Sequence, residues 1–115
     1  MVARERRRHV RLKPTPELPV HVSLAGGGMV REMLDVIDLS VGGFALSSPA
    51  LEAIKPGDRL RLNLALGGSP EQLIEVVARW VSRVGVGVEL VDPSPAASQQ
   101  LGRYIAELLE RGGSS

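Results

Sequence analysis

Residues 59–66, with the sequence RLRLNLAL, carry leucine at every second position. An extended strand points successive side chains to opposite faces, so a period of two places all four leucines on one side. A helix would scatter them around its axis. The turn sequence Pro56-Gly57-Asp58 comes directly before this segment. The pattern therefore predicts a half-buried β-strand entered from a turn.

Five other short segments have the composition of strands and are separated by turns rich in glycine or proline. They cover residues 20–24, about 29–37, 44–47, about 72–83 and 85–91. Short antiparallel strands joined in this way commonly close into a barrel, because closure removes the unpaired edges. We therefore expect an all-β fold, a six-stranded antiparallel β-barrel.

The last part of the chain has a different period. Its apolar residues recur at helical spacing, at Leu101, Tyr104, Ile105, Leu108 and Leu109. Ser94 can cap a helix, Pro95 suits its first turn, and Gly112 can end it. These residues predict one amphipathic C-terminal helix packed against the barrel.

Positive charge is concentrated at the N-terminus. Residues 1–13 contain six basic residues and one acidic residue, whereas the remainder contains eight basic and twelve acidic residues, a net charge of −4. We expect residues 1–13 to form a flexible basic arm, residues 14–111 the barrel and helix, and residues 112–115 a disordered tail. Such an arm predicts an anionic partner, although a solvated tail would have the same composition.

Composition also excludes several classes of function. Without cysteine the chain has neither disulfides nor thiol-based metal sites, and no apolar run is long enough to span a bilayer. His9 and His21 lack metal-site or catalytic spacing, and there is no P-loop. Only three residues are aromatic, too few for a typical single-strand nucleic-acid binder. We expect a cytoplasmic protein with no membrane insertion, catalytic residue, metal or nucleic-acid partner.

Two polar clusters remain, RRRHVR in the arm and DLSVGG between the second and third predicted strands. With these two motifs in this order, the chain resembles the PilZ domain family. The signatures of that family are RxxxR before the first strand and D/NxSxxG after the second. Arg7 and Arg11 match the first signature; Asp38, Ser40 and Gly43 match the second. The resemblance continues through GVGVEL in the last predicted strand and the helix. It implies a barrel that binds cyclic di-GMP and needs no cofactor.

The side chains of these motifs suit such a ligand. Guanidinium groups can grip phosphate oxygens in pairs, bond guanine acceptors or stack on a purine. Asp38 could accept hydrogen bonds from the guanine N1 and N2 donors, an edge that adenine lacks. Ser40 would add a hydroxyl, while Gly42 and Gly43 would permit an unusual turn and close approach of the ligand.

Local alternatives exist for the second motif. Asp38 and Ser40 could bond nearby backbone amides in a turn, as these residue types commonly do. Gly43 could be required only because its backbone needs a positive φ.

The other arm arginines are further candidates. An arginine directly before RxxxR resembles the arrangement that binds an intercalated ligand dimer, so Arg6 suggests two ligand molecules per site. Arg8 lies between the matched arginines, and we rank it below Arg6 because a solvated arm residue explains it better.

Trp80 also corresponds to an aromatic residue that lies near the ligand in some members of the family. Strand parity favours a different place, because Trp80 shares a predicted face with Ile74, Val76 and Ala78. Parity thus predicts core packing for Trp80, with guanine stacking as the alternative. Arg79 and Arg83 point the other way and could support a phosphate contact.

These features together predict a stand-alone receptor for cyclic di-GMP. We expect the ligand to order the arm over the barrel, and the new surface to be recognised by a downstream protein that the sequence does not identify. The alternative is a PilZ-like adaptor that binds no ligand and acts through protein–protein contacts.

Overall fold

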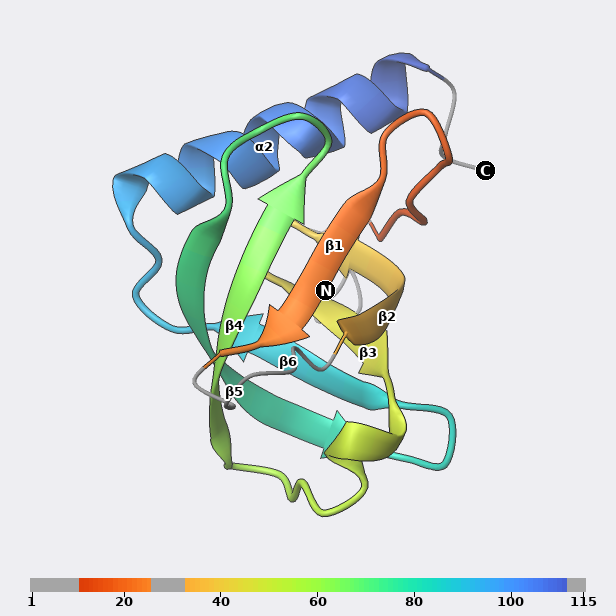
Figure 1. The fold of residues 1–115 in the computed structure, drawn as a ribbon, viewed down its shortest axis with the longest axis vertical. Coiled ribbons are helices and arrows are strands. Elements are labelled where there is room, and N and C mark those ends of the chain that lie inside the picture. Colours follow the sequence, from red (N-terminus) through yellow and green to blue (C-terminus); the bar gives the residue numbers. More distant parts are fainter. Residues whose placement is uncertain (1–10, 26–32, 112–115) are drawn as a thin grey trace, which may run out of the picture.

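The six strands of the computed structural model, which describes residues 11–25 and 33–111, form a closed antiparallel barrel (Figure 1). The strands are β1 (Val20–Leu24), β2 (Met33–Ser40), β3 (Gly43–Ser47), β4 (Arg59–Leu66), β5 (Gln72–Val81) and β6 (Val86–Leu90). Their order around the barrel is β1-β2-β3-β6-β5-β4, and β4 pairs with β1 to close it. The predicted fold class is confirmed.

The alternating leucines of β4 point into the barrel. Leu62, Leu64 and Leu66 are buried, whereas Arg59 and Arg61 on the opposite face are exposed. They share the core with Phe44 and with residues from every other strand. Burial of one leucine side chain contributes about 1.5–3 kcal/mol. The period of two places these leucines on the inward face, where their burial stabilises the barrel.

Helix α2 (Pro95–Glu110) lies across one end of the barrel and packs against β4 (Figure 1). The Ser94 side chain accepts a hydrogen bond from the Ala97 amide at 3.1 Å, and Pro95 occupies the first turn, as predicted. The predicted apolar face is buried except for Leu109, which is 44% exposed. No helix in the part of the chain described here is long and apolar enough to cross a membrane.

The segment before β1 is attached at both ends. Leu12 and Leu39 exchange backbone hydrogen bonds of 2.8 and 2.9 Å, and the Leu12 side chain is buried in the core. Further along, the Tyr104 hydroxyl donates to the carbonyl of Leu18. Leu12, a residue of the predicted arm, is therefore part of the core. Residues 1–10 and 112–115 of the predicted arm and tail lie outside the described residues.

Candidate functional site

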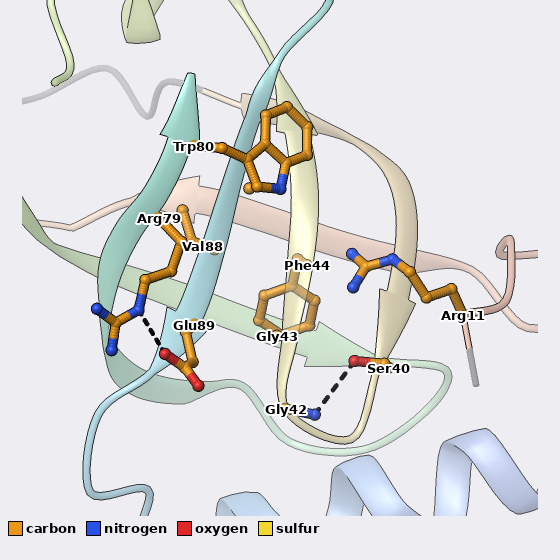
Figure 2. Close-up of a pocket in the computed structure, with 10 residues that line it drawn as sticks. Arg11, Ser40, Gly42, Gly43, Phe44, Arg79, Trp80, Val88 and Glu89 are labelled. Carbon is orange, nitrogen blue, oxygen red and sulfur yellow. Dashed lines mark hydrogen bonds and ion pairs between the residues drawn. The ribbon is translucent and has the colours of Figure 1, made fainter. Parts of the chain in front are cut away.

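A cavity of about 300 Å³ opens on the outer face of the barrel (Figure 2). It is lined by Arg11, Ser40, Gly42, Gly43, Phe44, Arg79, Trp80, Gly87, Val88 and Glu89. Its volume is at the lower end of the range of small-molecule sites, roughly 300–1,000 Å³. Five of the residues predicted from the sequence as ligand contacts therefore line one cavity: Arg11, Ser40, Gly42, Gly43 and Trp80.

The strand order decides the shape of this cavity. Strands β3 and β6 lie between β2 and β5, and they present Gly43 and Gly87 to the cavity. With adjacent strands about 4.8 Å apart, the backbones of β2 and β5 are roughly 14 Å apart as measured along the curved sheet. The cavity therefore has two walls, with Arg11 and Ser40 on one and Arg79 and Trp80 on the other. Its floor is formed by Gly43 and Phe44 of β3 and by Gly87 and Val88 of β6.

Arg11 and Asp38 form an ion pair at the first wall. The Asp38 Oδ1 atom lies 2.8 Å from Nε and 2.7 Å from Nη2 of Arg11. The reciprocal backbone bonds between Leu12 and Leu39 hold the two residues side by side. Asp38 does not line the cavity itself and reaches it through Arg11. The two motifs, 27 residues apart in the chain, thus meet in space.

The second motif begins inside a strand, contrary to the prediction. Strand β2 continues through Asp38 to Ser40, and only Val41 and Gly42 form the turn before β3. The buried Ser40 hydroxyl accepts a hydrogen bond from the Gly42 amide at 3.3 Å. Ser40 thus makes the local contact given as the alternative, and it also lines the cavity, whereas the Asp38 carboxylate binds Arg11.

Gly43 is required for a steric reason. Positive φ among the described glycines occurs at Gly57 and Gly67, so the alternative of a positive φ at Gly43 is wrong. A Cβ atom on Gly43 would overlap the carbonyl oxygen of Val88 and lie 3.1 Å from the Cα of Glu89. Any larger residue would push β3 away from β6.

A β-bulge turns Trp80 out of the core. Ala78 pairs with Val88 and Trp80 with Gly87, which leaves Arg79 as an extra residue in β5. The extra residue reverses the strand parity, so Ala78 points inward while Trp80 is 44% exposed and lines the cavity. The prediction of core packing for Trp80, which assumed unbroken alternation, is wrong.

A second bulge does the same for Asp38. In β2, Val36 pairs with Leu46 and Asp38 with Ala45, so Ile37 is the extra residue. Without it, Asp38 would share the inward face of Leu34 and Val36, whereas Leu39 now takes the buried position. The bulge in β5 thus turns Trp80 toward the cavity, and the bulge in β2 turns Asp38 toward Arg11. Bulges commonly direct side chains at functional sites.

The second wall holds another ion pair. Arg79 Nε lies 2.5 Å from Glu89 Oε1, and both side chains are more than half exposed. Arg83, the other basic candidate on β5, lines a separate depression with Leu51 and Val81. Sequence reasoning missed Phe44, Gly87, Val88 and Glu89 as lining residues. The pairing of β3 with β6, such as Gly43 with Glu89, depends on a strand register that the sequence does not show.

The described part of the site is electrically balanced. Both arginines that line the cavity pair with a carboxylate, Arg11 with Asp38 and Arg79 with Glu89. No cluster of three or more metal-ligating side chains occurs in residues 11–25 and 33–111. The remaining arginine candidates, Arg6, Arg7 and Arg8, lie outside the described residues.

The chain has relatives of known family and fold. The model of the PilZ domain family matches residues 5–107. The MrkH–c-di-GMP complex of K. pneumonia is 17% identical with a TM-score of 0.74, over 92% of this chain and 53% of MrkH, so this chain spans about half of that protein. The PilZ domain of Escherichia coli YcgR with c-di-GMP is 18% identical, with a TM-score of 0.69 over 93% of this chain and 94% of that domain.

A third similar structure is the Bacillus subtilis inhibitor of motility MotI/DgrA, 21% identical with a TM-score of 0.64, over 91% of this chain and 52% of that one. At these identities the three structures establish a shared fold. No curated protein sequence matches the chain.

Proposed function

Because this chain belongs to the PilZ domain family, we propose that it is a receptor domain for cyclic di-GMP. Two proteins of similar fold, MrkH and the YcgR PilZ domain, are complexes with that ligand. The single observation that carries the proposal is the Arg11–Asp38 pair, which joins the two signature motifs at the edge of a cavity floored by glycine.

The ion pair is suited to exchange partners with the ligand. A ligand phosphate replaces Asp38 on the Arg11 guanidinium, and guanine N1 and N2 donors replace Arg11 on the Asp38 carboxylate. The pair is partly exposed, with 47% of the Arg11 and 25% of the Asp38 side-chain surface accessible. Exposed pairs contribute only about 0–1 kcal/mol, so its loss costs the complex little.

The described part of the site has no excess positive charge, so we propose that the arm supplies it. A cyclic dinucleotide carries two phosphates, and neither Arg11 nor Arg79 is an unpaired cation. Residues 1–10 contain four arginines and one glutamate, a net charge of +3. We infer that Arg6 and Arg7 supply the missing positive charge and that the arm closes over the ligand as it binds.

Arg6 also accommodates a second ligand molecule, so the site takes an intercalated dimer. The closed arm presents a new surface to a downstream protein, and this surface is the output of the receptor. The domain acts by binding and not by catalysis.

Calorimetric titration tests the proposal. We expect saturable heat with cyclic di-GMP, and none of comparable affinity with cyclic di-AMP or GTP. R7A should abolish tight binding, while R83A, which changes an arginine outside the cavity, should bind as the wild type does. Absence of heat with all three nucleotides would contradict the proposal and favour the ligand-free adaptor.

A further inference from the structure

Trp80 and Gly87 are in close contact at the second wall. The two residues are partners across β5 and β6. A Cβ atom on Gly87 would lie 2.7 Å from Trp80 Cδ1 and closer still to Nε1 and Cε2. These are its three nearest neighbours, so the five-membered ring of the indole rests directly on the backbone of Gly87.

From this contact we propose that Gly87 is a positioning residue that holds the Trp80 indole as a stacking surface for a purine base. The inference rests on the proposed function. One part of the ring is supported by the strand, while 44% of the residue remains accessible and the side chain lines the cavity (Figure 2). A half-exposed aromatic ring held in one orientation is what base stacking requires.

The two glycines of the cavity floor differ in what an added methyl group would displace. At Gly43 the methyl group would meet the backbone of the neighbouring strand, which cannot move without breaking the barrel. At Gly87 it would meet the ring of Trp80, a residue that is 44% exposed to solvent. Substitution of Gly87 should therefore displace the Trp80 ring and leave the barrel folded.

The two walls then divide the recognition of the ligand. Stacking on Trp80 accepts any purine, because every base has a π-face, whereas Asp38 distinguishes guanine from adenine. Loss of the Trp80 surface should lower the affinities for guanine and adenine cyclic dinucleotides by the same factor. Loss of Asp38 should make these two affinities equal.

Trp80 is the only tryptophan, so its fluorescence reports on its own surroundings. The test compares wild type, G87A, W80A and the double variant, with G68A as control, because a Cβ on Gly68 would meet nothing within 4 Å. In the unliganded protein, G87A should change the emission spectrum and acrylamide quenching of Trp80 without loss of cooperative unfolding. G68A should change none of these.

In titrations with cyclic di-GMP, G87A and W80A should each lower the affinity by roughly 5- to 150-fold, the value of one base stacked on an aromatic ring. The double variant should bind no more weakly than W80A alone. Unchanged Trp80 fluorescence in G87A, an unfolded G87A, or a full further loss when G87A is added to W80A would each overturn the proposal.

Failure of the proposed function gives a different result. A wild-type protein that produces no heat with cyclic di-GMP would contradict the receptor role, whereas the fluorescence of unliganded G87A would still decide whether Gly87 positions Trp80.

Discussion

The Arg11–Asp38 ion pair has a proposed role in ligand binding and only a small role in stability. Both side chains are partly exposed and lie outside the apolar core of the barrel. Its contribution to stability is therefore small, and its importance lies in what the two side chains can bind when they part.

We predict that R11A and D38A each lower the affinity for cyclic di-GMP by roughly 100-fold, since each removes charge-assisted hydrogen bonds to the ligand. Both variants should keep the free energy of unfolding within about 1 kcal/mol of the wild type. Titration calorimetry and urea denaturation measure the two quantities. A variant that binds normally, or one that fails to fold, would contradict this separation of roles.

Tyr104 is buried in the core and does not line the cavity, so we consider its contribution to stability. Burial, together with the negative charge of Glu107, raises the pKa of Tyr104 from 10.0 to about 12. The neutral phenol is thus favoured in the folded state, where it donates to the Leu18 carbonyl. Its stabilising effect is complete below pH 10 and is lost as the pH rises from 10 toward 12.

Y104F should therefore lower the free energy of unfolding at pH 7 by about 1–3 kcal/mol, because the Leu18 carbonyl loses its partner. The difference between wild type and Y104F should shrink as the pH is raised above 10. Urea denaturation of both proteins from pH 7 to pH 11 tests this, and a difference that stays constant with pH would show that the hydroxyl is not the titrating group.

At the scale of elements, the seam between β3 and β6 carries the floor of the cavity. The strands pair from Gly43 with Glu89 to Leu46 with Val86. Their backbones approach so closely at Gly43 that no side chain fits there. Closure of the barrel therefore depends on this seam as much as the ligand site does.

We expect G43A to destabilise the barrel by about 1–3 kcal/mol or more, since the added methyl group would overlap the Val88 carbonyl. The matched substitution G68A should change stability by no more than about 0.5 kcal/mol. Thermal denaturation followed by circular dichroism compares the two. Equal melting temperatures would mean that the seam can open without cost.

Charge is distributed unevenly over the whole molecule, with a basic N-terminal segment and an acidic remainder. Residues 1–10 carry +3 of charge in a chain whose total is +1. The described part of this segment, from Arg11, begins at the edge of the cavity and is fastened to β2 through Leu12. The described chain therefore begins at the proposed ligand site.

We predict that cyclic di-GMP protects the arm from trypsin, which cleaves after the arginines at positions 4, 6, 7 and 8. Closure over the ligand would make these bonds inaccessible, so the rate of cleavage in the arm should fall at least tenfold at saturating ligand. Mass spectrometry of the fragments identifies the cut sites. R7A should remove the protection, whereas equal cleavage with and without bound ligand would exclude closure of the arm.

Local patterns were sufficient to predict most of the fold. The leucine alternation in residues 59–66, the turn at residues 56–58 and the cap at Ser94 act over a few neighbouring positions, so they are readable in the sequence and agree with the structure. The two motifs also identified residues that meet, Arg11 with Asp38, although only their order along the chain suggested it.

The orientation of the site residues required the tertiary structure. An extra residue at Ile37 and another at Arg79 reverse the parity of two strands, which turns Asp38 and Trp80 outward. A bulge arises where a strand must match the register of its partner, and that partner is distant in sequence. Alternation along a single strand determines which side chains could be buried, and pairing across the barrel decides which ones are.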